Sequence, residues 1–186
     1  MVEADGRRAY ANIGGLDQYR RMLVLVPVSD DHAYVVDVFR VRGGSTHDWA
    51  VHGSADHDMT AESNVALVPR PAGLLETGEK WVEPRDEQSQ YHVWGVIREV
   101  QQGIAQGGVE ATLRYVDERN KGVRVHLLAG SPTQVVLGRS PAPRRARGDT
   151  RKAWDYWMPQ LIVRCTGDAA LETTFAAVEE PFEGEP

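Results

Sequence analysis

Apolar and polar residues alternate with a period of two along most of this chain. The alternation is strictest over residues 122–128, where two valines and a leucine fall on one face of a predicted strand and arginine and histidine on the other. A second alternating run at 109–116 precedes it. The polar stretch 117–121 between the two runs is typical of a hairpin turn.

Shorter apolar runs predict further strands. They lie at residues 90–100, 133–138, 160–166 and 171–178. Within the first of these runs, the sequence Val-Trp-Gly-Val-Ile favours a strand over a helix, because branched and aromatic residues are enriched in sheets.

Another hairpin is predicted near the N-terminus, from residues 21–26 and 33–41 around the polar segment 29–32. Both runs are apolar along nearly their whole length, which is typical of strands covered on both faces, or nearly so. No segment carries a sustained helical stripe with caps. The pattern therefore predicts an all-β fold, an antiparallel, supersandwich-like β-sandwich with few or no helices, as a single domain over residues 1–186.

Two stretches lack this periodicity and are expected to be irregular. Residues 54–86 contain several prolines and glycines and are expected to be mostly loop, with a short strand at 64–68. Loops of that length are often functional or cover a sheet edge. Residues 140–150 combine prolines with arginines and are expected to form an exposed loop.

Composition narrows the class of protein. Hydrophobic residues make up 41% and charged residues 26% of the 186 residues, which is ordinary for a globular protein and argues against disorder. The net charge of -6 argues against nucleic-acid binding, and no apolar run has the length of a membrane span. The one cysteine, Cys165, excludes an intrachain disulfide, and its apolar surroundings predict a buried structural thiol.

A dense polar segment holds three histidines beside aspartates: His47, His52 and His57. Imidazole and carboxylate groups are common ligands of a divalent metal such as zinc. On a strand, however, His47 and His52 would face opposite sides and could converge only across a bend. The alternative interpretation is a hydrogen-bonded corner after Gly43 and Gly44, in which the histidines satisfy buried backbone groups.

Two aspartates in this part of the chain are expected to have structural roles. Asp37 lies inside an apolar strand, where a carboxylate needs partners such as Arg40, Arg42 or a backbone amide. A structural ion pair is the favoured interpretation. Asp48 is expected to be a structural polar residue as well.

Aromatic and basic residues near the C-terminus suggest a binding surface for carbohydrate. Trp154 and Trp157 are candidates for stacking on sugar rings, although core packing or a lid would explain them as well. Arg144 and Arg145 belong to a basic segment that could meet an anionic polymer, or could simply be a solvated loop.

Several short motifs carry a family resemblance that spans roughly residues 10–181. They are 36–44 (VDVFRVRGG), 47–49 (HDW), 52–53 (HG), 122–128 (GVRVHLL), 158–164 (MPQLIVR) and 175–181 (FAAVEEP). In this order they resemble the C-terminal region of heparinase II/III-like polysaccharide lyases, including alginate-lyase relatives.

The resemblance implies a function and a set of partners. Such lyases cleave acidic polysaccharide by β-elimination at a uronic acid, with an N-terminal α/α toroid that carries most catalytic residues. No catalytic residue is therefore transferred to this chain. The sandwich pattern starts close to Met1, so the chain is expected to be the C-terminal part of a larger enzyme, periplasmic or secreted. The surface that meets the toroid would be apolar and liable to self-associate.

Three functional hypotheses follow. The first is the sandwich domain of such a lyase, with a structural or substrate-positioning role and no complete active site. The second is a stand-alone carbohydrate-binding module that uses the tryptophans and the basic segment 144–152. The third is a metal-dependent, sandwich or cupin-like enzyme centred on His47, His52 and His57.

Overall fold

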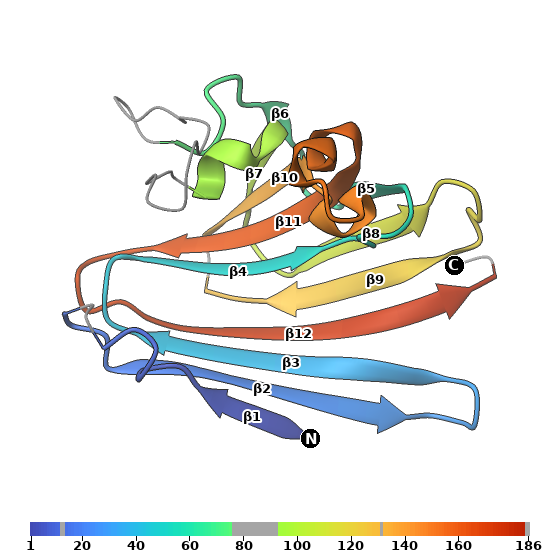
Figure 1. Ribbon diagram of the computed structural model, residues 1–186. Coiled ribbons are helices and arrows are strands. Elements are labelled where there is room, and N and C mark those ends of the chain that lie inside the picture. The colour runs from blue at the N-terminus through green and yellow to red at the C-terminus, as the bar shows by residue number, and fades with distance from the viewer. Residues whose placement is uncertain (12–13, 76–92, 131, 185–186) are drawn as a thin grey trace.

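In the computed structural model, the chain folds into two antiparallel sheets that face each other (Figure 1). The structure describes residues 1–11, 14–75, 93–130 and 132–184. The larger sheet has seven strands in the order β1 (Val2–Asp5), β2 (Gln18–Pro27), β3 (Ala33–Arg42), β12 (Glu172–Glu183), β9 (Lys121–Leu128), β8 (Val109–Tyr115) and β5 (Met59–Ser63). The smaller sheet has five, in the order β4 (Thr46–His52), β11 (Trp157–Thr166), β10 (Thr133–Pro141), β7 (Arg98–Ala105) and β6 (Val68–Pro69). The predicted all-β sandwich is confirmed.

Both predicted hairpins form with the register that alternation requires. In β2–β3, Val24 pairs with Val36, and the turn closes with the Val28 amide donating to the His32 carbonyl at 2.8 Å. In β8–β9, Val125 and Leu127 point between the sheets and are fully buried, while the residues between them point outward.

The main core fills the space between the sheets. Within it, Phe39 and Phe175 stack at 6.1 Å between ring centroids, and Tyr19 meets Phe39 edge-on at 5.0 Å. Trp49, on β4 of the opposite sheet, is also fully buried. Trp49 and Phe175 are the largest fully buried side chains, and the other buried members of this core are mostly aliphatic residues of both sheets.

A smaller core lies on the outward face of the five-stranded sheet. Its members are Leu74, Ile97, Val100, Val136 and Ile162, with Trp94 and Val96 packed against them. Because this smaller core covers the outward face, the smaller sheet has buried side chains on both faces. Apolar runs without alternation predict strands of this kind.

The single cysteine lies in the main core. Cys165 is buried near Thr133, with 3.8 Å between its Sγ and the Oγ1 of Thr133, and burial raises the pKa of its thiol. The predicted burial of this thiol is confirmed.

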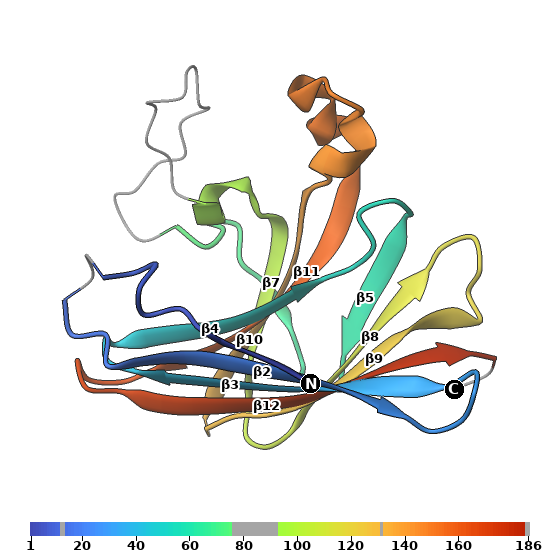
Figure 2. The ribbon, with the colours of Figure 1, turned by 60° about the horizontal axis from the view of Figure 1, so that its bottom comes forward.

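The larger sheet has no such cover on its outward face. Figure 2 shows the other described elements on the opposite side of β2, β3 and β12. Within the described residues, the prediction that the β2–β3 hairpin is covered on both faces, or nearly so, is therefore wrong, although most of the outward positions are apolar.

Two predictions of short strands need correction. The strand predicted at 90–100 begins only at Arg98, after the 3-10 helix η1 (Val93–Val96), because Trp94 and Val96 turn onto the small core; residues 90–92 lie outside the described part. The strand predicted at 64–68 is wrong, since β5 ends before this segment and β6 starts at its last residue. Residues 76–86 of the predicted loop also lie outside the described part.

The segment 140–150 is not an exposed loop. Strand β10 continues to Pro141, and two 3-10 helices follow, η2 (Pro143–Ala146) and η3 (Thr150–Asp155). Ala142 and Ala146 are buried, so this segment packs as a small lobe at the end of the smaller sheet. None of the helices in the described residues is long and apolar enough to cross a membrane.

Candidate functional site

A buried carboxylate connects the two sheets. Asp37 on β3 is fully buried and accepts hydrogen bonds from Arg21 on β2, with 2.6 Å between Nη2 and Oδ2, and from the indole of Trp49 on β4, with 2.7 Å between Nε1 and Oδ2. The partners expected from the sequence, Arg40 and Arg42, are wrong, because they occupy even positions of β3 and point to its other face.

A second carboxylate lies close to this network. Glu179 on β12 is half-buried, and burial raises its pKa, as does the negative charge of Asp37 to a smaller extent. The positive charge of Arg21 lowers the pKa but does not offset the other two effects. Arg21 therefore interacts electrostatically with both carboxylates, but it donates its hydrogen bonds to Asp37.

His47 is a structural histidine rather than an available ligand. It points between the sheets from β4, with 2.8 Å from Nε2 to the Gly43 carbonyl oxygen and 3.0 Å from Nδ1 to the Thr173 hydroxyl. Gly43 and Gly44 adopt φ values of 101° and 82°, which allow the turn that brings this carbonyl back to the ring. Both ring nitrogens are thus occupied.

The other two histidines lie elsewhere. His52 is on the outward face of β4 and its Nδ1 lies 2.7 Å from the Gly53 carbonyl oxygen, whereas His57 packs edge-on against Tyr115. Among the residues that the structure describes, no three His, Cys, Asp or Glu side chains are placed to hold a metal. The three-histidine centre considered from the sequence does not form.

Asp48 also forms an ion pair on the smaller sheet. It faces outward from β4, and Arg164 on β11 donates from Nε to Oδ1 at 2.7 Å and from Nη2 to Oδ2 at 2.8 Å. The guanidinium also lies over the ring of Trp94 at 5.7 Å. This pair fastens η1 to the sheet.

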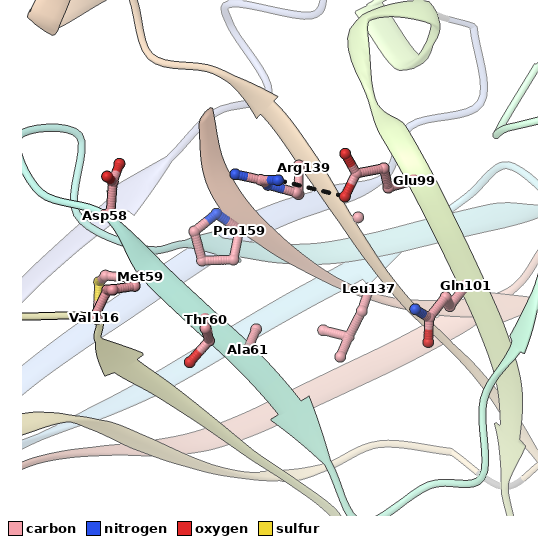
Figure 3. A pocket seen from close by; sticks show the side chains of 11 residues that line it. Asp58, Met59, Thr60, Ala61, Glu99, Gln101, Val116, Leu137, Arg139 and Pro159 are labelled. Carbon is pink, nitrogen blue, oxygen red and sulfur yellow. Dashed lines mark hydrogen bonds and ion pairs between the residues drawn. The ribbon is translucent and has the colours of Figure 1, made fainter. Parts of the chain in front are cut away.

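An open cleft of about 420 Å³ lies where β5 diverges from β7, β10 and β11. Figure 3 shows Asp58 and Thr60 on one side of it, Glu99 and Gln101 on the other, and Arg139 between them. The rest of the lining is mostly apolar: Met59, Ala61, Val116, Leu137, Gly138 and Pro159. The cleft therefore offers hydrogen-bond donors and acceptors beside an apolar surface.

A β-bulge aims Glu99 at the cleft. Leu137 pairs with Gln101, whereas Arg139 pairs with Arg98, so one extra residue is accommodated opposite Gly138. Glu99 takes the left-handed conformation, with φ of 52°, which is uncommon outside glycine. Its Oε2 then lies 3.4 Å from Nη1 of Arg139.

Gly138 is required for this bulge to pack. A Cβ atom at this position would lie 2.6 Å from Cγ2 of Ile97, a side chain of the small core. The bulge therefore affects both the shape of the cleft and the packing of the small core on the other face of the sheet. Substitution of Gly138 would disturb both.

The two arginines predicted to bind substrate lie at the rim of the cleft, where each pairs with a carboxylate. Arg145 donates to Asp58 at 2.6 Å between Nη1 and Oδ1 and lies 4.3 Å from the ring centroid of Tyr156. Arg144 pairs with Asp56 at 3.0 Å. These contacts attach η2 to the segment before β5, so both guanidinium groups already have carboxylate partners.

The two predicted tryptophans lie together beside the cleft. The rings of Trp154 and Trp157 are 5.7 Å apart at 65°, an edge-to-face contact, and the Arg98 guanidinium lies 5.8 Å from the Trp154 ring. Trp157 is two residues from Pro159 on the same face of β11, about 7 Å along the strand from the cleft lining.

Sequence reasoning missed Glu99, Gln101 and Arg139. The available signal was Gly138 inside an apolar strand, because an isolated glycine in a strand often marks a bulge. Comparison with known proteins adds no assignment, since no family model matches the chain and no curated protein is significantly similar to it.

We expect Asp37→Asn to lower the free energy of unfolding by about 2–3 kcal/mol, measured by urea denaturation. The change keeps the size of the side chain but removes the charge opposite Arg21, and breaking a buried pair is costly; partial exposure of Arg21 limits the loss. Asp17→Asn is the control, because its pair with Arg42 is exposed. Equal stability of the two variants would contradict the structural role of Asp37.

We expect Glu179→Gln to stabilise the protein at neutral pH by less than about 1 kcal/mol. A carboxyl group whose pKa is raised on folding binds protons more tightly in the folded state, so stability falls as pH rises past its ordinary pKa. The gain should therefore disappear at a pH below the ordinary pKa of glutamate. Thermal unfolding of wild type and variant across this pH range measures it.

Glu172→Gln is the matched control for this pH series, because Glu172 is exposed at the start of β12 and faces outward. A gain that persists in acid, or that the control reproduces, would exclude the buried carboxylate as its source.

Proposed function

We propose that this chain is a glycan-binding β-sandwich domain that positions an acidic polysaccharide. On the sequence resemblance, it serves as the C-terminal part of a heparinase II/III-like lyase and has no complete active site of its own. The observation that carries the proposal is the cleft at the edge of the sandwich, where Arg139 and Glu99 meet beside an apolar lining.

The chemistry of the cleft suits a uronic acid. Hydroxyl groups of a sugar need both donors and acceptors, which Thr60, Gln101 and Asp58 supply, and its C–H faces need apolar contact. The Arg139–Glu99 pair is weak, since its contact is 3.4 Å long and the side chains are 42% and 68% exposed. The carboxylate of a uronate would compete for Arg139, because arginine binds carboxylates in a bidentate manner.

The tryptophan pair extends this surface along the polymer. Trp157 lies about two residues from the cleft lining on the same face of β11. When one sugar unit is bound in the cleft, the next unit of the polymer would therefore lie near the Trp157 ring. Aromatic rings stack on the apolar faces of sugars while their edges remain in contact with water. The site therefore fits an oligosaccharide better than a single sugar.

The same lining argues for a role in positioning rather than in catalysis. β-Elimination needs a base such as Tyr or His beside a group that neutralises the uronate carboxylate. Arg139 could provide the second function, but none of the described residues that line the cleft is a tyrosine or histidine.

We expect Arg139→Gln to weaken binding of alginate or heparin oligosaccharides at least tenfold, measured by isothermal titration calorimetry. Glu99→Gln should strengthen binding of these acidic ligands, because it removes the carboxylate that competes for Arg139. Arg20→Gln is the matched control, since Arg20 also pairs with an exposed glutamate but lies on the outward face of β2. Wild-type affinity in Arg139→Gln would exclude the cleft as the binding site.

We expect this chain alone to form no product from heparin, heparan sulfate or alginate. Formation of unsaturated uronates, followed by ultraviolet absorbance, measures this directly. Robust product would overturn the positioning role, and loss of that product on substitution of His47, His52 or His57 would place catalysis in this chain.

A further inference from the structure

The outward face of the larger sheet carries a contiguous block of apolar side chains, which we call the apolar face. Its members occupy even-numbered positions of β2, β3, β9 and β12, and cross-strand pairs such as Val24–Val36 and Val36–Val178 place them side by side. They are Met22, Val24, Val26, Tyr34, Val36, Val38, Leu128, Ala176 and Val178.

The apolar face is uncovered in the part of the chain that the structure describes. Leu128 is 66% exposed and the other eight members are partly buried. Figure 2 shows the other elements on the opposite side of β2, β3 and β12. Contiguous apolar patches on a soluble protein commonly mark an interface. Because sheets stack face to face, an uncovered sheet surface is suited to receive another sheet.

Charged residues bracket the apolar face along the strands. At one end, Arg20 and Arg40 are cross-strand neighbours, and Arg40 has no ion-pair partner among the described residues. At the other end, Glu180 accepts from Arg124 at 3.0 Å. Glu180 lies six residues after Thr174, the neighbour of Arg40, so the two ends are about 20 Å apart.

We propose that two copies of this chain stack through the apolar face, related by a two-fold axis that lies in the interface and runs across the strands. This axis reverses strand direction, so Arg40 of each copy meets Glu180 of the other while the apolar block meets itself. An axis along the strands would instead place arginine against arginine, which is unfavourable. The dimer does not depend on glycan binding, because the cleft opens on the other side of the sheet.

The face is large enough for such a contact. Four strands spaced about 4.8 Å apart and about five residues at about 3.3 Å along each strand give the apolar block a plane on the order of 300 Å². The charged residues at its two ends extend the contact to about eight residues along the strands, a plane on the order of 500 Å². Because side chains project from this plane, the solvent-accessible area is larger than the plane itself. It approaches the roughly 800 Å² per partner that is usual for a stable interface.

Sedimentation equilibrium on the wild-type chain tests the proposal, with an expected mass twice the 20.6 kDa of one chain. Val36→Lys places a charge at the centre of the face and should give a folded monomer, as judged by circular dichroism. The control is Leu25→Lys, which changes a more exposed apolar residue, 65% exposed, on the opposite face of β2 and should leave the dimer intact.

Charge reversal tests the direction of the axis. Arg40→Glu and Glu180→Arg should each weaken the dimer at least tenfold, and the two changes together should restore it. A monomeric wild type, a dimeric Val36→Lys variant, or failure of the double variant to recover would each overturn the proposal.

Discussion

The sandwich depends on one buried carboxylate that both sheets share. Asp37 lies on the larger sheet, yet one of its partners, the indole of Trp49, belongs to the smaller one. A buried charge tolerates few arrangements, because any shift that removes a donor leaves it without compensation. Hydrophobic packing alone would accept several relative positions of two sheets, so this network selects among them.

The position of this constraint explains where the molecule can open. Strands β3 and β4 are held together through Asp37 on one side of the sandwich, whereas β5 and β7 lie on the other side in the order of their sheets. There the two sheets diverge to form the cleft, and the bulge at Glu99 points its carboxylate into it. The sandwich is therefore closed on the side where Asp37 connects β3 and β4, and open on the side where β5 and β7 form the cleft.

Local patterns predicted the strands well but could not predict the site. Alternation at 122–128 depends only on neighbouring residues and placed each side chain on its correct face. The same rule, applied to β3, would have excluded Arg40 and Arg42 as partners of Asp37. The cleft, in contrast, arises from pairing between β7 and β10 and from the approach of β5, contacts between residues far apart in sequence. Trp154 and Trp157 could be proposed as a pair from the sequence because they are close together in it.

Cys165 gives experimental access to the motions of this fold. The thiol lies between the sheets and is the only one in the chain, so a thiol reagent can reach it only when the sandwich opens. Its labelling rate, compared with that of an unstructured peptide, would report the population of open molecules without any engineered cysteine. Because Cys165 is on β11 and pairs with His47 on β4, that rate would describe the side of the sandwich that Asp37 holds closed.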